Sequence, residues 1–168
     1  TKGDPNVTVA VIDSDLEMEH PAFSNTNFVH PYDCSTKHSD IGAYGNHGTK
    51  VAGIIAANPN DSIMAGIAPN VSIMPIVYTN TIIKNYKSHS EMIASCIFWA
   101  VDHGEDVLNC SWRERRIKKG RLRSALLEDA IQYALFEGRN GKGCIVVFAG
   151  GNGETSLWSS SKAIYYPA

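Results

Sequence analysis

Short apolar runs and longer segments with helical spacing alternate along the chain. Runs rich in β-branched and other apolar residues predict strands, and the first of them lacks polar alternation, as expected of a strand buried on both faces. The predicted strands are residues 8–12, 27–30, 71–77, 106–110 and 144–149. Pro75 interrupts one run and predicts an irregularity at that point.

Three segments between these runs have the periodicity of helices, at residues 47–57, 88–101 and 122–135. The first places Val51, Ile54 and Ile55 on one face, and its small residues let it press closely against a sheet. Ser88 and Glu91 have the spacing of a capping box, which predicts the start of the second helix. The alternation of strands and helices predicts an α/β fold with a mostly parallel sheet and helices on both faces.

The composition fits one globular domain. The 168 residues are 43% hydrophobic and 19% charged, which is enough apolar material for a core. The formal net charge of −2 gives no electrostatic reason to expect nucleic acid or an anionic membrane as a partner. No apolar run approaches the roughly 18 residues of a membrane span. No signal peptide opens the chain.

The most strongly charged segment is residues 113–123, with seven basic residues and one acid. Such a run is typical of a solvated loop. A second interpretation is a preference for acidic substrate side chains. A nucleic-acid patch is disfavoured because no aromatic residues are interleaved with the charges.

The four cysteines favour free thiols over disulfides. Cys96, Cys110 and Cys144 each lie in an apolar run, where a buried thiol behaves as a small hydrophobic group. Cys34 lies in a polar stretch. An even count permits disulfides, but no spacing of the metal-binding or redox type is present.

Candidate chemistry lies where predicted strands end, because sites in parallel sheets form at the carboxyl edge. Asp13, Ser111 and Asn152 follow predicted strands, and His47 begins a predicted helix. An acid and a His at one sheet edge can activate a hydroxyl for attack on a peptide carbonyl. From spacing alone, the favoured interpretation is the simpler one, in which Asp13 caps a turn and His47 lies on a helix surface.

The local sequences favour catalysis. Residues 9–14, followed by His20-Pro21, resemble the catalytic Asp segment of the subtilisin family, and residues 46–53 resemble its catalytic His segment. Further family landmarks follow in family order at residues 66–69, 109–112, 143–153 and 166–168, the second of them in a kexin-like form. The resemblance implies that Asp13 orients His47, that His47 is the general base, and that Asn152 is the oxyanion donor.

The same resemblance implies a substrate cleft with two walls. One would pair with an extended substrate as an added strand, and the other would line the pocket for the residue before the cleaved bond. These substrate-binding positions are Ser111, Trp112 and Arg113 for the first wall and Phe148, Ala149 and Gly150 for the second. Three residues depart from the family pattern: Asp15 and Arg113 replace a usual Gly, and Gly150 replaces a usual Ala or Ser.

No nucleophilic Ser of the family type is present. The only Gly-Thr pair, Gly48-Thr49, belongs to the His segment, and Ser156 and residues 159–161 follow Asn152 too soon. Residues 1–168 are therefore expected to be the N-terminal portion of a subtilisin-like peptidase domain, an incomplete fold that is inactive alone. The parent would be a serine endopeptidase whose nucleophile lies outside this chain.

Two other functions stay open at this point: a non-catalytic binding module with the same fold, and a relative that transfers the acyl group to an amine. Dinucleotide binding is weaker, because no G-x-G-x-x-G opens a helix after a strand. The resemblance requires no cofactor for the chemistry. Family members often bind calcium, but no ligand positions can be matched here, so no metal ligand is assigned. The implied partner is a peptide or protein, and the implied location is secreted or cell-envelope; the oligomeric state is open.

Overall fold

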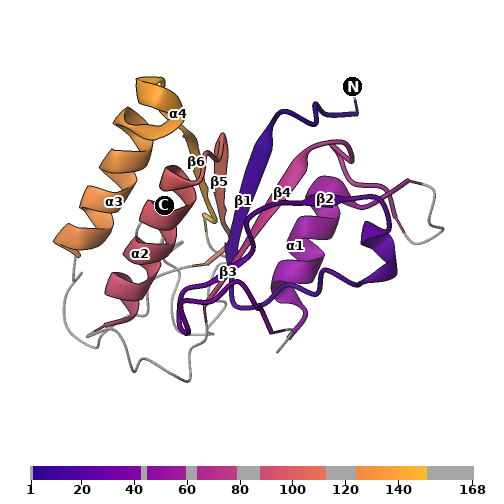
Figure 1. Ribbon diagram of the computed structural model, residues 1–168, viewed down its shortest axis with the longest axis horizontal. Helices are drawn as coiled ribbons and strands as arrows, with labels where there is room; N and C mark the ends of the chain where they lie inside the picture. Colours follow the sequence, from indigo (N-terminus) through magenta and orange to yellow (C-terminus); the bar gives the residue numbers. More distant parts are fainter. Residues whose placement is uncertain (1, 43–44, 60–63, 79–87, 113–123, 151–168) are drawn as a thin grey trace, which may run out of the picture.

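Parallel strands form the centre of the structure (Figure 1). The structure is a computed structural model that describes residues 2–42, 45–59, 64–78, 88–112 and 124–150. Within these residues one six-stranded sheet has the order β2-β4-β1-β5-β6, with β3 also paired to β4, and every named pairing is parallel. The strands are β1 (Thr8–Asp13), β2 (Asn27–Phe28), β3 (Tyr32–Asp33), β4 (Ser72–Val77), β5 (Val107–Cys110) and β6 (Ile145–Phe148).

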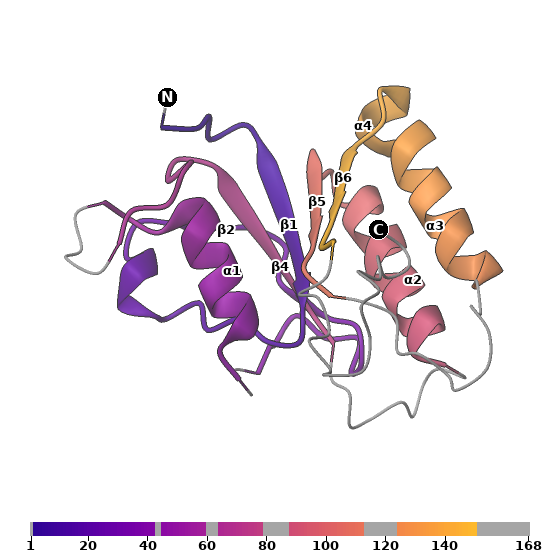
Figure 2. The same cartoon turned by 180° about the vertical axis from the view of Figure 1, so that it is seen from behind.

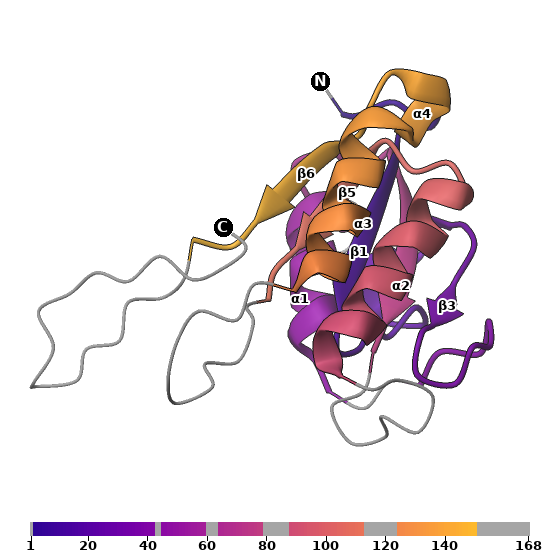
Figure 3. The same ribbon diagram turned by 90° about the vertical axis from the view of Figure 1, so that its left-hand side faces the viewer.

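Helices cover both faces of this sheet, as Figures 1 and 2 show from opposite sides. One face carries α1 (His47–Ala56), and the other carries α2 (His89–Asp102) and α3 (Ala125–Phe136), which lie side by side in Figure 3. Two short pieces, η1 (Pro21–Phe23) and α4 (Gly138–Gly141), complete the described helices. The predicted α/β class is confirmed. No helix in the described part of the chain is long and apolar enough to cross a membrane.

β1 lies between β4 and β5 and is buried on both faces. Val9 and Val11 join the apolar cluster under α1, whereas Ala10 and Ile12 join the cluster under α2 and α3. Side chains on a strand point alternately to its two faces, so a strand with a core on each face needs apolar residues at every position. This explains why the run lacks polar alternation.

The small face of α1 packs against the sheet, as predicted. Ala52 and Ala56 have no exposed surface, whereas Ile54 on the outer side is 56% exposed. Small side chains let the helix axis approach the strands closely; Val51 and Ile55 pack at the edge of this cluster, and Ile54 is turned away. The apolar face predicted around Ile54 is therefore only partly buried.

Pro75 does not break β4. The strand runs through Pro75 in register with Val11 of β1. On its other edge, β2 pairs with Ser72 and Ile73, and β3 pairs with Ile76 and Val77. The irregularity is therefore in the neighbouring strand. That strand is split into β2 and β3 opposite Pro75, which has no N–H to donate to it. The pattern did not predict β3.

The expectation of free thiols is wrong for Cys34 and Cys96, which form a disulfide. The loop after β3 returns to the end of β4, where the Cys34 N–H donates to the carbonyl of Val77 at 2.9 Å. This brings Cys34 to α2 with a Cα–Cα distance of 5.8 Å to Cys96, within the range that a disulfide requires. Polarity along the sequence gave no information on this long-range approach. Cys110 and Cys144 are buried free thiols, as expected.

One apolar region of the sheet has no cover from the described residues. Ile145 and Val147 of β6 are 59% and 46% exposed. Ile145 is in register with Val107, whose side chain packs with the cluster under α1, so both face the α1 side of the sheet. α1 packs on β1, and β5 lies between β1 and β6 in the sheet. Among the described residues, none covers the α1 side of the sheet at β6.

Glu105, between α2 and β5, is a fully buried carboxyl group. It has no exposed surface, and neither side-chain oxygen has a hydrogen-bond partner in the described residues. Burial raises its pKa from 4.5 to about 7, opposed by the Cys144 thiol and reinforced by the nearby charges of Asp106 and Asp102. The folded protein therefore holds Glu105 protonated at pH values where the unfolded chain ionises it.

This burial predicts a stability that falls as the pH rises. Below pH 4.5 Glu105 is protonated in both the folded and the unfolded state and does not affect stability. From pH 4.5 to about 7 only the unfolded chain loses the proton, so the stability falls. Above about pH 7 both states are ionised and the stability falls no further on account of Glu105. The loss is about 3 kcal/mol. We expect Glu105→Gln to remove this difference in urea denaturation at pH 4 and pH 8. An equal pH-dependent loss in the wild type and the variant would show that Glu105 is not its source.

Candidate active site

Asp13 is the last residue of β1 and provides the buried half of the site. Its side chain is 4% exposed. The N–H of Ser14 donates to Oδ1 at 2.7 Å, and the Asp13 main-chain carbonyl accepts from the N–H of Tyr78 at 3.0 Å. Asp13 is thus fixed at the carboxyl edge of the sheet, its carboxylate by the residue after β1 and its main chain by the residue after β4.

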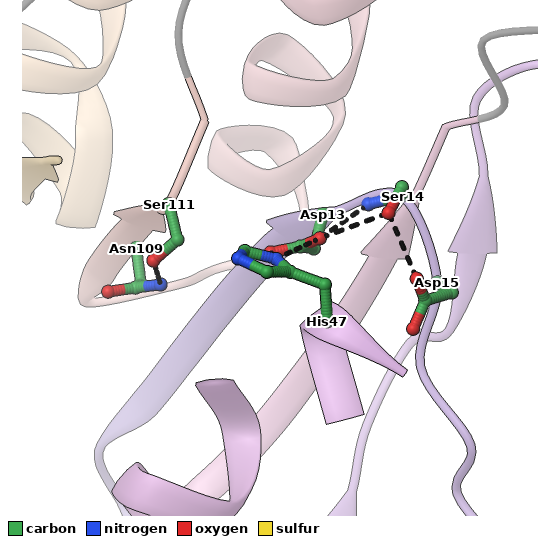
Figure 4. A network of polar contacts seen from close by, with 6 residues as sticks. All are labelled: Asp13, Ser14, Asp15, His47, Asn109 and Ser111. Carbon is green, nitrogen blue, oxygen red and sulfur yellow. Dashed lines mark hydrogen bonds and ion pairs between the residues drawn. The ribbon is translucent and has the colours of Figure 1, made fainter. Parts of the chain in front are cut away.

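His47 is the first residue of α1, and its imidazole lies on Asp13. Nδ1 is 2.9 Å from both carboxylate oxygens of Asp13. A donor at Nδ1 leaves the lone pair on Nε2, which is the tautomer that a general base needs. The side chain is 60% exposed, and in Figure 4 one ring nitrogen is turned to Asp13 and the other away from it. The structure brings together two of the three predicted catalytic residues.

Gly48 allows α1 to begin this close to β1. A Cβ atom at Gly48 would lie 2.8 Å from the Cβ of Asp13 and would overlap the main-chain carbonyl oxygen of Asp15. A real Cβ cannot occupy that space unless the backbone shifts. The residue after His47 must therefore be a glycine if the imidazole is to reach Asp13.

Opposing effects act on the Asp13 carboxyl group. Burial raises its pKa, and this outweighs the hydrogen bonds from His47 and Ser14, which lower it. A buried carboxylate that is short of solvent gains more from a neighbouring positive charge, so it favours the imidazolium that forms when His47 takes a proton. Cys110 lies near Asp13, and burial together with the Asp13 charge raises the pKa of its thiol. Cys110 therefore stays protonated and is not a nucleophile.

The predicted substrate-binding residues come from the ends of two neighbouring strands. β5 and β6 are in register at Cys110 and Phe148, and the Ala149 N–H donates to the Cys110 carbonyl at 3.1 Å. Trp112 is buried and its ring meets that of Phe148 edge to face, with centroids 5.6 Å apart. Ser111 is half-buried beside Trp112. The two predicted walls thus leave the sheet side by side.

Gly150 lies in open surroundings at the end of this segment. A Cβ atom added there would meet nothing within 4 Å. Two predicted site residues, Arg113 and Asn152, lie outside the described residues, as do Ser156 and residues 159–161.

Three polar residues of this region were not predicted as site residues. Asn109 donates from its side-chain amide to the Ser111 hydroxyl at 3.1 Å. Ser14 and Asp15 extend the contacts of Asp13, since the Ser14 hydroxyl lies 2.9 Å from Asp15 Oδ2 (Figure 4). Asn109 is a polar residue within an apolar strand, and Asp15 departs from the family pattern; both signals are visible in the sequence.

Comparison with known proteins decides the family. Residues 4–168 match the profile of the subtilase family of peptidases, Peptidase_S8. The chain belongs to the subtilase family. Its predicted relationship is confirmed, and Asp13 and His47 lie in the two segments that carried the resemblance.

The subtilase relatives are named as proteases. The chain is 32% identical to a calcium-dependent protease of Trichormus variabilis over 94% of this chain and 25% of the relative. It is 33% identical to a thermophilic serine proteinase of Bacillus sp. strain AK1 over 93% of this chain and 35% of the relative. It is 34% identical to subtilisin DY of Bacillus licheniformis over 97% of this chain and 53% of the relative. The chain thus spans a quarter to about half of these subtilases.

Solved structures of subtilases share the fold. The nisin leader peptidase NisP of Lactococcus lactis aligns with a TM-score of 0.69 and 28% identity over 91% of this chain and 46% of that one. Fervidolysin of Fervidobacterium pennivorans, a keratinolytic enzyme related to subtilisin, aligns with a TM-score of 0.66 and 28% identity over 88% of this chain and 22% of that one. The parallel sheet with helices on both faces is therefore the subtilase architecture.

Proposed function

We propose that the full-length protein is a serine endopeptidase that hydrolyses peptide bonds through an acyl-enzyme. Residues 1–168 are the N-terminal portion of its peptidase domain and supply every catalytic group except the nucleophile. The observation that carries this proposal is the contact of His47 Nδ1 with the buried carboxylate of Asp13 at 2.9 Å. A non-catalytic binding module has no need of this pair.

The proposed reaction uses each group in turn. A serine hydroxyl supplied from outside residues 1–168 attacks the carbonyl carbon of the substrate, and His47 Nε2 takes its proton while Asp13 holds the imidazolium. The side-chain amide of Asn152 donates to the carbonyl oxygen as that oxygen becomes negative. His47 then gives the proton to the leaving amine. Water, deprotonated by His47 in its turn, hydrolyses the acyl-enzyme and restores the serine.

The substrate would lie between the ends of β5 and β6. Main-chain groups of Ser111, Trp112 and Arg113 would pair with an extended peptide, which gains affinity from backbone hydrogen bonds. Phe148, Ala149 and Gly150 would line the pocket for the residue before the cleaved bond. The shared register of β5 and β6 and the packing of Trp112 on Phe148 support this arrangement.

The bare part of the sheet supports a nucleophile outside the chain. A parallel sheet is normally covered on both faces, and exposed apolar patches of this kind mark contact surfaces. Ile145 and Val147 lie exposed on the α1 side of β6, beside the strand end from which the proposed pocket is built. The remaining part of a peptidase domain that carries the serine would cover this surface. The one-quarter to one-half coverage of the relatives fits this interpretation.

The disulfide bears on where the parent protein is located. The disulfide between Cys34 and Cys96 supports a location outside the reducing cytosol, in agreement with a secreted or cell-envelope enzyme.

One relative is named a calcium-dependent protease. In the described ranges no three His, Cys, Asp or Glu side chains form a group that can hold a metal ion, so no calcium ligand is assigned. The chemistry proposed here needs no cofactor, and its partner is a peptide or protein.

Labelling with a fluorophosphonate probe tests the proposed function. The probe reacts covalently with an activated serine, so we expect it to label the full-length protein and to leave a protein of residues 1–168 unlabelled. Labelling of the full-length protein should be lost in a His47→Ala variant, whereas an Asp129→Asn variant, altered on the exposed side of α3, should label normally. An unlabelled full-length protein would favour a non-catalytic subtilase module. A labelled fragment would contradict the assignment of the nucleophile to a segment outside it.

A further inference from the structure

A second carboxylate lies buried beside the catalytic pair. Asp15 follows Asp13 by two residues in the turn after β1 and is 3% exposed. Its Oδ2 accepts a hydrogen bond from the Ser14 hydroxyl at 2.9 Å. Its Oδ1 is sealed from solvent and has no hydrogen-bond partner in the described residues. Figure 4 shows Asp15, Ser14, Asp13 and His47 in one continuous chain of polar contacts, and the reaction proposed above gives Asp15 no role.

The segment that carries His47 closes directly over Asp15. A Cβ atom added at Gly45 would lie 2.6 Å from Asp15 Oδ2, and one added at Gly48 would overlap the Asp15 carbonyl oxygen. Glycines on both sides of His47 thus touch the same residue. Asp15 has no room to turn its charge toward solvent, so this charge keeps a fixed position relative to the imidazole.

Ser14 has one hydroxyl proton for two carboxylates. Its Oγ lies 2.9 Å from Asp15 Oδ2 and 3.3 Å from Asp13 Oδ1. Because a hydroxyl donates one hydrogen bond, the shorter contact takes the proton. Asp13 Oδ1 then faces the hydroxyl oxygen without a proton between them, and its donors are the Ser14 N–H and His47 Nδ1.

We propose that Asp15 is a positioning residue of this active site: it draws the Ser14 hydroxyl proton away from Asp13 and fixes a second negative charge beside the catalytic pair. The proposal deepens the peptidase function and rests on it. With fewer donors, Asp13 binds His47 Nδ1 more strongly. With two negative charges nearby, the imidazolium that forms during serine attack is stabilised further.

The other titratable groups that face the two carboxylates do not supply the negative charge that Asp15 supplies. The charge of Asp15 contributes to the raised pKa of Asp13, although burial is the larger cause. From α1 the facing titratable group is His47 itself, and from β5 it is the Cys110 thiol, whose raised pKa keeps it neutral. Directly after β4, Tyr78 donates its main-chain N–H to the Asp13 carbonyl.

Asp15→Asn in the full-length protein tests the proposal. The variant keeps the shape of the side chain, removes its charge, and supplies an amide that can donate to Ser14 Oγ, so that the hydroxyl turns its proton to Asp13 Oδ1. We expect the acidic midpoint of the kcat/KM pH profile to move down by about half a pH unit, since one charge near the imidazolium is lost. The plateau of kcat/KM should fall by about threefold. Asp129→Asn, which removes a charge from the exposed side of α3, should leave the profile unchanged.

A second measurement does not depend on peptidase activity. In ¹³C NMR of the aspartate carboxyl groups, the Asp13 titration midpoint should fall in the Asp15→Asn variant, because both the charge and the competition for the Ser14 proton are gone. A fall confined to activity, with an unchanged pH profile and an unchanged Asp13 midpoint, would overturn the proposal and leave Asp15 a structural residue. If the full-length protein cleaves no peptide at all, the peptidase function fails, and the Asp13 titration still decides the role of Asp15.

Discussion

Asp13→Asn is expected to lower kcat/KM of the full-length protein by about 10⁴, the size of loss known when the orienting acid of a serine-peptidase triad becomes an amide. The reason is the contact of His47 Nδ1 with both carboxylate oxygens at 2.9 Å. An amide at this position offers its NH₂ group to Nδ1, which moves the imidazole proton to Nε2. His47 then cannot accept the proton of the serine.

The measurement is a steady-state assay of wild type and variant on one peptide substrate, with thermal unfolding as the check on folding. The removal of a buried charge from Asp13 should not unfold the domain, so the two proteins should melt within a few degrees of each other. Asp33→Asn provides a matched control, because Asp33 is also 3% exposed at a strand end but binds the main chain of Ser35. A loss of less than tenfold in Asp13→Asn would contradict the triad role.

The second large effect is expected from the disulfide. Simultaneous Cys34→Ala and Cys96→Ala substitutions should lower the free energy of unfolding by about 4 kcal/mol, since the bond closes a loop with a sequence separation of 62. The bond ties the loop after β3 to the middle of α2, two segments that otherwise meet through side-chain packing and a hydrogen bond from the Ser35 hydroxyl to Met92 Sδ. Its loss therefore frees the unfolded chain more than it disturbs the folded one.

Chemical denaturation with and without reductant measures this effect. Reductant should destabilise the wild type by the same amount as the double substitution and should leave the double variant unchanged. Mass spectrometry of a non-reduced digest should find the peptides of Cys34 and Cys96 joined, with Cys110 and Cys144 free for alkylation after unfolding. A wild type indifferent to reductant, or a digest without the cross-link, would refute the assignment.

Local patterns in the sequence predicted most of the elements and the placement of Asp13 and His47 at one edge of the sheet. β1, α1 and α2 lie within two residues of their predicted bounds, because strand burial, helical spacing and the Ser88 cap are all local signals. Asp13 and His47 were also predicted from local signals, since each lies in a segment that resembles the family. Short pieces such as β3 were missed because two residues carry no periodicity.

Features that depend on distant partners were not predictable. Cys34 lies in a polar stretch of the sequence, yet it is fully buried, because its loop lies against α2 in the folded protein. Ile54 is exposed because the small residues of α1, on another side of the helix, face the sheet. The competition between Asp13 and Asp15 for one Ser14 proton depends on distances that differ by a few tenths of an ångström. No spacing rule contains that information.

The central place of β1 in the sheet has a kinetic consequence. Its neighbours are distant in the chain: Thr8 pairs with Ser72 of β4, and Val9 pairs with Val107 of β5. The entropy of closing such long loops is lost before any pairing compensates for it, which makes folding slow in proteins rich in non-local contacts. Until both neighbours arrive, the two edges of this buried strand stay open to other chains. We therefore expect folding and aggregation of this chain to compete at the assembly of β1 between β4 and β5.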